Sequence, residues 1–175
     1  MPCAEGPTDC TNAHDPEAWV EVGTGDPELA GFEPIPADSR MDLFPGPQQG
    51  YHVYVQARST GLCANSVLFE RKLREPGETA VLRSQSSRIR MVEVEGEPGT
   101  WVFPRAQATF VCPATSPGIE MAGRPFDLEV VLTDSPGCNE TFEPRSVSTH
   151  VTIVPTCSET DLLCAEDTEA GCAAH

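Results

Sequence analysis

Proline and glycine interrupt this chain so often that only short elements of secondary structure fit between them. Seventeen prolines and fourteen glycines stand mostly between short apolar runs. Proline has no backbone N–H to donate, so it is tolerated at the borders of strands and on edges but not in a central ladder. Short apolar runs separated by turn residues are typical of an all-β sandwich or barrel. We therefore predict an all-β fold, an antiparallel β-sandwich.

Eight segments carry strand-like patterns, and none shows helical periodicity. We predict strands at 18–23, 50–58, 66–73, 79–83, 88–95, 106–112, 126–133 and 147–154. Successive side chains of a strand point to opposite faces. In the second strand this alternation assigns to the core Tyr51, Val53, Val55 and Ala57, and to solvent His52, Tyr54, Gln56 and Arg58. In the last strand it assigns to the core Val147, Thr149, Val151 and Ile153, and to solvent Ser148, His150 and Thr152.

The cysteines indicate disulfide bonds. Eight of them occur, at positions 3, 10, 63, 112, 138, 157, 164 and 172, without any Cys-x-x-Cys pair. Zinc ribbons and redox dithiols need that close spacing, whereas an even count spread along a chain favours disulfides. Stable disulfides form in oxidising compartments. We therefore expect an extracellular, periplasmic or outer-membrane-anchored protein.

Strand direction restricts the central disulfide pairs. If residues 79–95 form one bent strand, alternating directions place Cys63 and Cys138 at one end of the sandwich and Cys112 and Cys157 at the other. Only cysteines at a common end can come within bonding distance. We predict the pairs Cys63–Cys138 and Cys112–Cys157. The remaining cysteines then staple the two termini, locally or to each other: Cys3, Cys10, Cys164 and Cys172.

Three regions are expected along the chain. Residues 1–17 form a polar tether, 18–156 the sandwich domain, and 157–175 an acidic, cysteine-containing tail. Cys3 follows directly after Met1 and Pro2, a position suited to a lipid-anchored cysteine ahead of a tether. A Cys3–Cys10 disulfide is an equal alternative. No run of about 18 apolar residues occurs, so we expect no transmembrane segment.

A resemblance to known proteins rests on residues 46–62 (GPQQGYHVYVQARSTGL), with VGTG at 22–25 and GFEPI at 31–35. These segments resemble a group of exported proteins, often lipoproteins, of myxobacteria and related bacteria. Their recurrent element is a Gly-x-Gln-Gly-Gly-x-His stretch before a strand, and here Gln49 stands where a glycine is usual. Residues 127–134 are similar, more loosely, to the last strands of immunoglobulin-like bacterial domains. The resemblance implies an immunoglobulin-like sandwich and an exported location, and no activity.

The same glycine-rich stretch offers a candidate ligand site at Gln48 and His52. A turn before a strand can present backbone N–H groups to a ligand, with a histidine nitrogen beside them. A tight turn in which Gln48 or His52 satisfies a loop carbonyl explains the residues more simply, and we favour it. An alternative site for a divalent metal ion would use His52 and His150 with nearby carboxylates, but two solvated polar residues are the simpler interpretation.

Charge and missing motifs limit the function. The formal net charge is −16, which would repel nucleic acid and anionic membranes. No hydrolase, nucleotide-binding or zinc-protease motif is present, so we expect no enzyme and no cofactor. We expect a non-catalytic exported or cell-surface module with a binding or structural role. Its loops at 44–50, 113–123 and 134–146 would face a protein or glycan partner.

Overall fold

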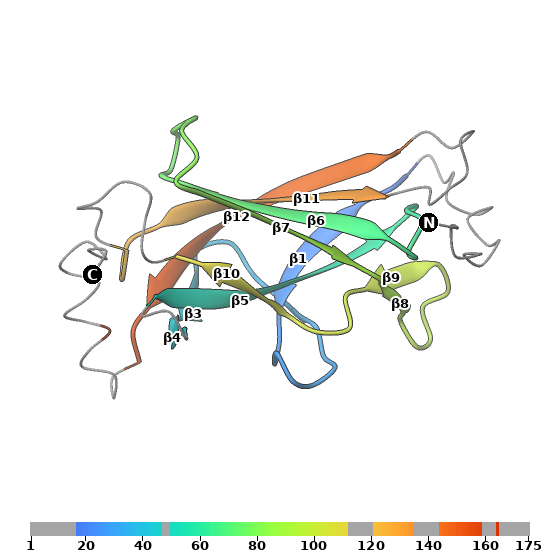
Figure 1. The fold of residues 1–175 in the computed structure, drawn as a ribbon, viewed down its shortest axis with the longest axis horizontal. Helices are drawn as coiled ribbons and strands as arrows, with labels where there is room; N and C mark the ends of the chain where they lie inside the picture. The colour runs from blue at the N-terminus through green and yellow to red at the C-terminus, as the bar shows by residue number, and fades with distance from the viewer. Residues whose placement is uncertain (1–16, 47–49, 112–120, 135–143, 159–163, 165–175) are drawn as a thin grey trace, which may run out of the picture.

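Two β-sheets packed face to face form the body of the protein (Figure 1). The computed structural model describes residues 17–46, 50–111, 121–134, 144–158 and Cys164. The strands are β1 (Val20–Thr24), β2 (Glu33–Pro34), β3 (Ser39–Asp42), β4 (Phe44–Pro45), β5 (Tyr51–Thr60), β6 (Val67–Arg74), β7 (Arg83–Ile89), β8 (Val92–Glu93), β9 (Thr100–Val102), β10 (Gln107–Phe110), β11 (Phe126–Asp134) and β12 (Ser146–Thr156). The all-β class is confirmed, and no helix among the described residues is long and apolar enough to cross a membrane.

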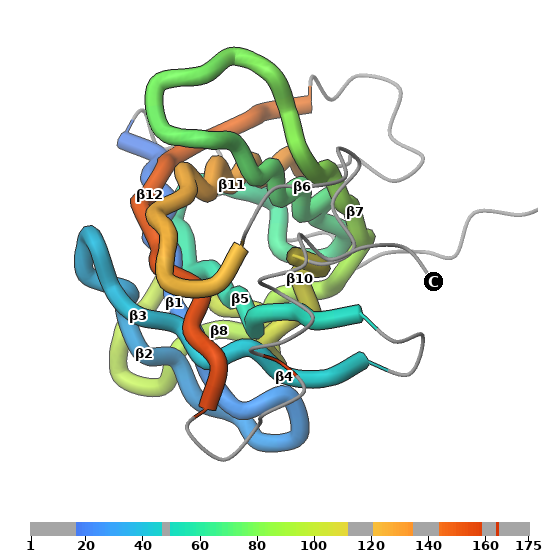
Figure 2. Tube along the Cα trace, turned by 90° about the vertical axis from the view of Figure 1, so that its left-hand side faces the viewer, coloured from blue at the N-terminus to red at the C-terminus, as the bar shows by residue number. Residues whose placement is uncertain are grey.

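The two sheets differ in regularity. One has seven strands, in the order β2-β1-β5-β9-β8, with β4 and β10 also pairing with β5. The other has five, in the order β3-β12-β11-β6-β7. Seen from the end of the molecule, the two sheets form separate layers (Figure 2). Strand β5 is therefore the centre of the first sheet, while β11 and β6 are the centre of the second.

One strand pair departs from the predicted antiparallel arrangement. Strand β3 pairs with β12 in parallel, whereas the other strand pairs of the described residues are antiparallel. The chain crosses between the sheets just before β3, at Asp38, whose φ of 59° is left-handed. Aspartate tolerates this conformation better than most residues. The Asp38 N–H donates to the Thr152 carbonyl at 2.8 Å, which sets β3 beside β12.

Six of the eight predicted strands are confirmed at least in part. The predicted strand at 79–83 overlaps an observed strand only at Arg83, where β7 begins, and the one at 88–95 contains the end of β7 and the two residues of β8. Residues 75–82 connect β6 to β7 in a hairpin that contains Gly77 at a φ of 77°. Sequence alternation also missed the short strands β2, β3, β4 and β9. The strand directions nevertheless follow the predicted parity, because β7 is antiparallel to β6 and β6 is antiparallel to β11.

The core lies between the sheets and is built from the predicted inner faces. Tyr51, Val53, Val55 and Ala57 of β5 are all buried. They meet buried side chains of the second sheet, including Phe69, Leu128, Val130, Leu132 and Ile153. Phe69 stacks on Phe103 with ring centroids 4.6 Å apart. The alternation of β12 is also as predicted, since Ile153 is buried and Ser148 and His150 are exposed.

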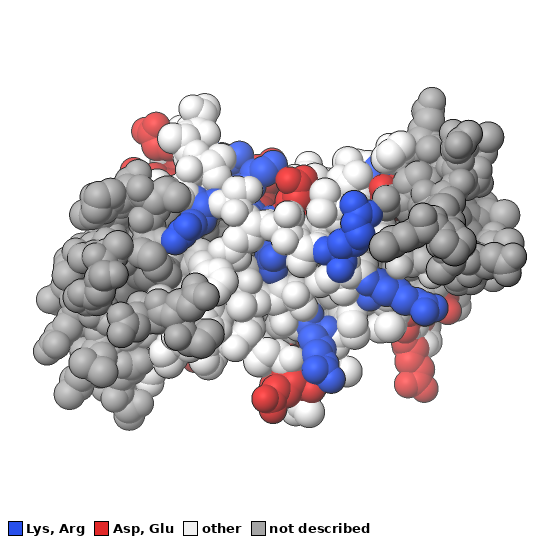
Figure 3. Space-filling view, in the orientation of Figure 1, with Lys and Arg blue, Asp and Glu red and all other residues white. Residues whose placement is uncertain are grey.

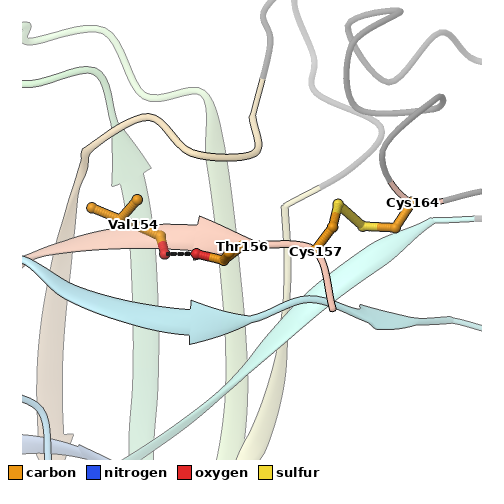
Figure 4. The surroundings of a disulfide bond; sticks show 4 residues. All are labelled: Val154, Thr156, Cys157 and Cys164. Atoms are coloured by element: carbon orange, nitrogen blue, oxygen red, sulfur yellow. Dashed lines mark hydrogen bonds between the residues drawn. A yellow bond between two sulfur atoms is a disulfide. The ribbon is translucent and has the colours of Figure 1, made fainter. Parts of the chain in front are cut away.

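A disulfide joins Cys157, directly after β12, to Cys164 (Figure 4). The predicted Cys112–Cys157 pair is therefore wrong. The two cysteines are only seven residues apart in the sequence. Strand parity alone did not reveal this local pair. Cys164 is fully buried and belongs to the core, which fixes the beginning of the acidic tail on the sandwich.

Cys63 is also disulfide-bonded. Its predicted partner, Cys138, lies outside the described residues, as do Cys3, Cys10, Cys112 and Cys172. The Cys63 N–H donates to a carboxylate oxygen of buried Asp134 at 3.0 Å. The other Asp134 oxygen accepts from the Arg145 N–H at 2.7 Å. Cys63 and the end of β11 therefore lie at one end of the sandwich, as the Cys63–Cys138 prediction requires.

Candidate functional site: a groove beside an aromatic cluster

Four aromatic rings lie together on the outer side of β5. Phe44 of β4 and Tyr54 of β5 have centroids 5.0 Å apart. His52 meets Tyr54 edge-on at 4.9 Å and Phe110 of β10 at 5.8 Å. Such tilted and edge-to-face contacts are favourable for aromatic pairs. Strands β4 and β10 both pair with β5 here, Phe44 and Phe110 each standing opposite His52, so the register builds the cluster.

The structure corrects the predicted exposure of His52. Its side chain lies within the cluster and the residue is only 5% exposed. Neither ring nitrogen has a hydrogen-bond partner, and burial lowers the pKa of His52 below its usual value. Gln56, also predicted to face solvent, is buried and donates to the Phe103 carbonyl. The outer face of β5 is covered here by residues of β4 and β10 and by the loop after β1.

A surface groove of about 390 Å³ lies beside this cluster. Its lining comes from the end of β1, the following loop and strands β2 to β5: Thr24, Gly25, Asp26, Pro27, Glu33, Arg40, Met41, Asp42, Phe44 and Tyr54. The sequence from Arg40 to Phe44 explains one wall. Met41 and Leu43 are buried, while Arg40, Asp42 and Phe44 alternate with them and are exposed. Alternate residues of extended chain are about 6.6 Å apart, so these three form an outward row.

The opposite wall is shaped by the connection between β1 and β2. Gly25 passes so close to Gln56 and Gly31 that an added Cβ would lie 2.8 Å from the Gln56 side-chain oxygen. Asp26 accepts hydrogen bonds from the N–H groups of Glu28 at 2.6 Å and Leu29 at 3.2 Å. The Thr24 hydroxyl donates to the Tyr54 carbonyl at 2.8 Å. A glycine, an Asx turn and a side-chain bond thus hold this loop beside the aromatic rings.

Three polar side chains of the groove are available to a ligand. Within the described part of the chain, the side chains of Arg40, Asp42 and Glu33 make no hydrogen bond or ion pair. No group of three or more His, Cys, Asp or Glu side chains among the described residues is placed to hold a metal ion. An exposed ring beside carboxylate acceptors and one guanidinium is suited to a ligand that has both an apolar face and several hydroxyl groups.

The predicted site residues are not brought together in this groove. Gln48 lies outside the described residues, as do most of the predicted loops 113–123 and 134–146. His52 supports the groove from behind the Phe44 and Tyr54 rings. His150 is exposed on β12, in the other sheet. The two histidines, proposed as a metal pair, are thus separated by the sandwich.

A larger hollow of about 510 Å³ surrounds His150 on the outer side of β6, β11 and β12. Three of its charged groups have partners. Arg74 forms an ion pair with Glu129 at 2.7 Å, and Asp127 accepts from the Thr152 hydroxyl at 3.0 Å. The Glu78 and His150 side chains of the hollow make no hydrogen bond or ion pair within the described residues.

Sequence reasoning missed Arg40, Asp42 and Phe44. The signal was present, because the stretch 39–44 alternates polar or exposed residues with Met41 and Leu43. The run is short, and its two strands belong to different sheets, so the alternation is interrupted after Asp42.

A scan against protein-family models finds no match to this chain, and a search of curated proteins finds none either.

Proposed function

We propose that this protein is a non-catalytic, exported or cell-surface β-sandwich module that binds a saccharide in the Phe44 groove. The observation that carries the proposal is the exposed ring of Phe44, 42% exposed, beside Tyr54 and in line with Arg40 and Asp42. A pyranose presents an apolar C–H face and several hydroxyls. Its apolar face would pack on the Phe44 ring, while its hydroxyls would bond to the carboxylate and guanidinium.

The exported location rests on separate support. Cys157 and Cys164 form a disulfide and Cys63 is in another, which favours an oxidising compartment. The resemblance of residues 46–62 to exported proteins agrees with this. Cys3 would either carry a lipid anchor or form a disulfide with Cys10. The intact mass of the natively exported protein distinguishes them, because acylation adds a diacylglyceryl group.

Affinity electrophoresis tests the binding proposal against many saccharides in parallel. The oxidised protein is run through native gels that each contain one neutral or acidic polysaccharide. We expect retardation in at least one gel, and loss of that retardation in Phe44→Ala. Trp19→Ala is the matched control, because Trp19 has a similar exposure of 39% and lies outside the groove. Equal retardation of Phe44→Ala and the parent protein, or no retardation in any gel, contradicts the proposal.

A further inference from the structure

Strand β7 is an unusually long free edge for this molecule. The strands that end the sheets are otherwise short: β2 and β8 have two residues each and β3 has four. Strand β7 has seven residues, pairs with β6 along its whole length, and has no strand on its other side among the described residues. It contains no proline or bulge that would discourage further pairing. Its free edge is therefore regular enough to accept another strand.

The neighbouring edge strand, β10, differs from β7 because its backbone is hydrogen-bonded by side chains. Strand β10 lies across the open side of the sandwich from β7. The Phe110 N–H donates to the Gln85 side-chain oxygen at 3.1 Å, and Arg71 donates to the Ala108 carbonyl at 3.4 Å. Side chains from the second sheet thus satisfy the backbone of β10. Among the described residues, no corresponding side-chain bond to the backbone of residues 84–89 of β7 is found.

The surface around β7 is positively charged although the chain as a whole is strongly acidic. Residues 79–92 and 98–111 contain no Asp or Glu, and they include Arg83, Arg88, Arg90 and Arg105. Lys and Arg side chains are spread over the face that carries β7, while Asp and Glu lie mainly near its borders (Figure 3). Arg88 and Arg90 are exposed and form no ion pair within the described part of the chain. Arg88 donates to the Ser66 hydroxyl at 3.2 Å, but no carboxylate of the described residues neutralises either arginine.

A buried cation strengthens this local field. Arg71 is 4% exposed, its Nε has no hydrogen-bond partner, and no carboxylate of the described residues forms an ion pair with it. Burial lowers the pKa of Arg71 to about 10, which still leaves it protonated at neutral pH. Its guanidinium lies over the Phe69 ring at 4.7 Å, and it donates to the Ser87 hydroxyl of β7 at 3.3 Å. The charge is therefore held directly beneath the edge strand.

We propose that β7 is a docking edge for an extended acidic peptide, which would join the five-stranded sheet as a further strand beside Arg88 and Arg90. Main-chain hydrogen bonds would supply affinity, and acidic side chains opposite the arginines would supply selectivity. A second copy of this chain fits less well, because the net charge of −16 opposes self-association. The proposal concerns the other sheet and does not depend on the groove.

The probe is a fluorescent peptide of the same length as β7, with alternating glutamate and threonine. Its control carries the same charges but has N-methyl groups on alternate amides, made in both registers, so that one version blocks strand pairing. We expect N-methylation in one register to weaken binding at least about 10-fold. Equal binding of the unmodified peptide and both N-methyl peptides would show attraction by charge alone, as to any polyanion, and would overturn the proposal.

Protein variants test the location. Arg88→Glu with Arg90→Glu is expected to weaken binding at least about 10-fold, because two attractions become repulsions. Arg124→Glu, at an exposed site on the turn before β11, changes the charge by the same amount per site. It also breaks the ion pair of Arg124 with Glu75, and it is expected to change affinity less than about 2-fold. The folding of each variant is checked by its thermal melt. Unchanged binding by the β7 double variant, or no binding of the peptide to the parent protein, overturns the docking edge.

Discussion

The smaller groove and the larger hollow differ in how their charged groups are used. Around His150, Arg74 and Glu129 bind each other, and Asp127 accepts from Thr152. Around Phe44, Arg40 and Asp42 have no such partners within the described residues, and an exposed ring stands beside them. The first arrangement ties charged groups to the sheet surface, whereas the second leaves Arg40 and Asp42 without a side-chain partner among the described residues.

The largest expected effect on stability comes from the core. It tests whether the sheet that carries the groove and the sheet that carries the larger hollow differ only on their outer faces. Val55 of β5 and Val130 of β11 are both fully buried on the inner faces. Removing two methylene equivalents and leaving a cavity should cost about 2.5 kcal/mol for either Val55→Ala or Val130→Ala. Urea unfolding measures both. A large difference between them would mean that the two sheets do not contribute equally to one core.

His52 and His150 provide the next comparison. Because His52 is buried among rings, His52→Ala should cost about 1.5 kcal/mol, less than either valine since two unsatisfied nitrogens also disappear. His150→Ala, at an exposed position, should change stability by less than about 0.5 kcal/mol. Thermal melts of the two variants decide this. Equal melting temperatures would show that the aromatic cluster does not enclose His52.

Arginine substitutions compare Arg74, which forms an ion pair, with Arg40, which forms none among the described residues. Arg74→Ala removes a half-buried ion pair with Glu129 and should cost about 1 kcal/mol. Arg40→Ala should cost less than about 0.5 kcal/mol, because Arg40 is exposed and has no partner to lose among the described residues. Denaturant midpoints give both values. A larger loss for Arg40→Ala would mean that the groove charges serve stability and are not available to a ligand.

The smallest expected effect is a dependence on pH. Burial lowers the pKa of folded His52, while the unfolded side chain titrates near its ordinary value of about 6.5. The unfolded chain therefore takes up the proton first, and this stability contribution is present above about pH 6.5 and lost as the pH falls through the lowered pKa. His52→Leu should flatten stability between about pH 7.5 and about pH 5.5 relative to His150→Leu. Identical slopes in the two variants would argue against a buried neutral imidazole.

The sequence predicted the inner faces well because period-two alternation directly reports which side of a strand faces a core. It did not predict the covering of the outer side of β5. His52 and Gln56 are buried by partners that come from β4, β10 and the loop after β1, and alternation within β5 contains no information about them. The same reason explains the missed groove. Arg40, Asp42 and Phe44 meet Tyr54 only after the chain has crossed between sheets.

The Cys157–Cys164 bond illustrates a related limit. Strand directions correctly related β6, β7, β11 and β12, but a strand direction does not determine which cysteine pairs with Cys157. Parity could therefore group cysteines by the end of the sandwich but could not choose between a distant and a local partner. The Cys63–Cys138 pairing stays a prediction. Non-reducing peptide mapping checks it, and a fragment joining Cys63 to Cys112 would contradict it.

The most direct test of the saccharide-binding groove is a chemical-shift map. The ¹⁵N-labelled, oxidised protein is titrated with soluble fragments of the polysaccharide that retards it most in native gels. We predict that the amide signals that move saturably belong to the segment from Arg40 to Phe44, to Tyr54 and to the loop at Gly25 and Asp26. Shifts centred instead on Arg74, Glu129 and His150 would place binding in the larger hollow and contradict this assignment.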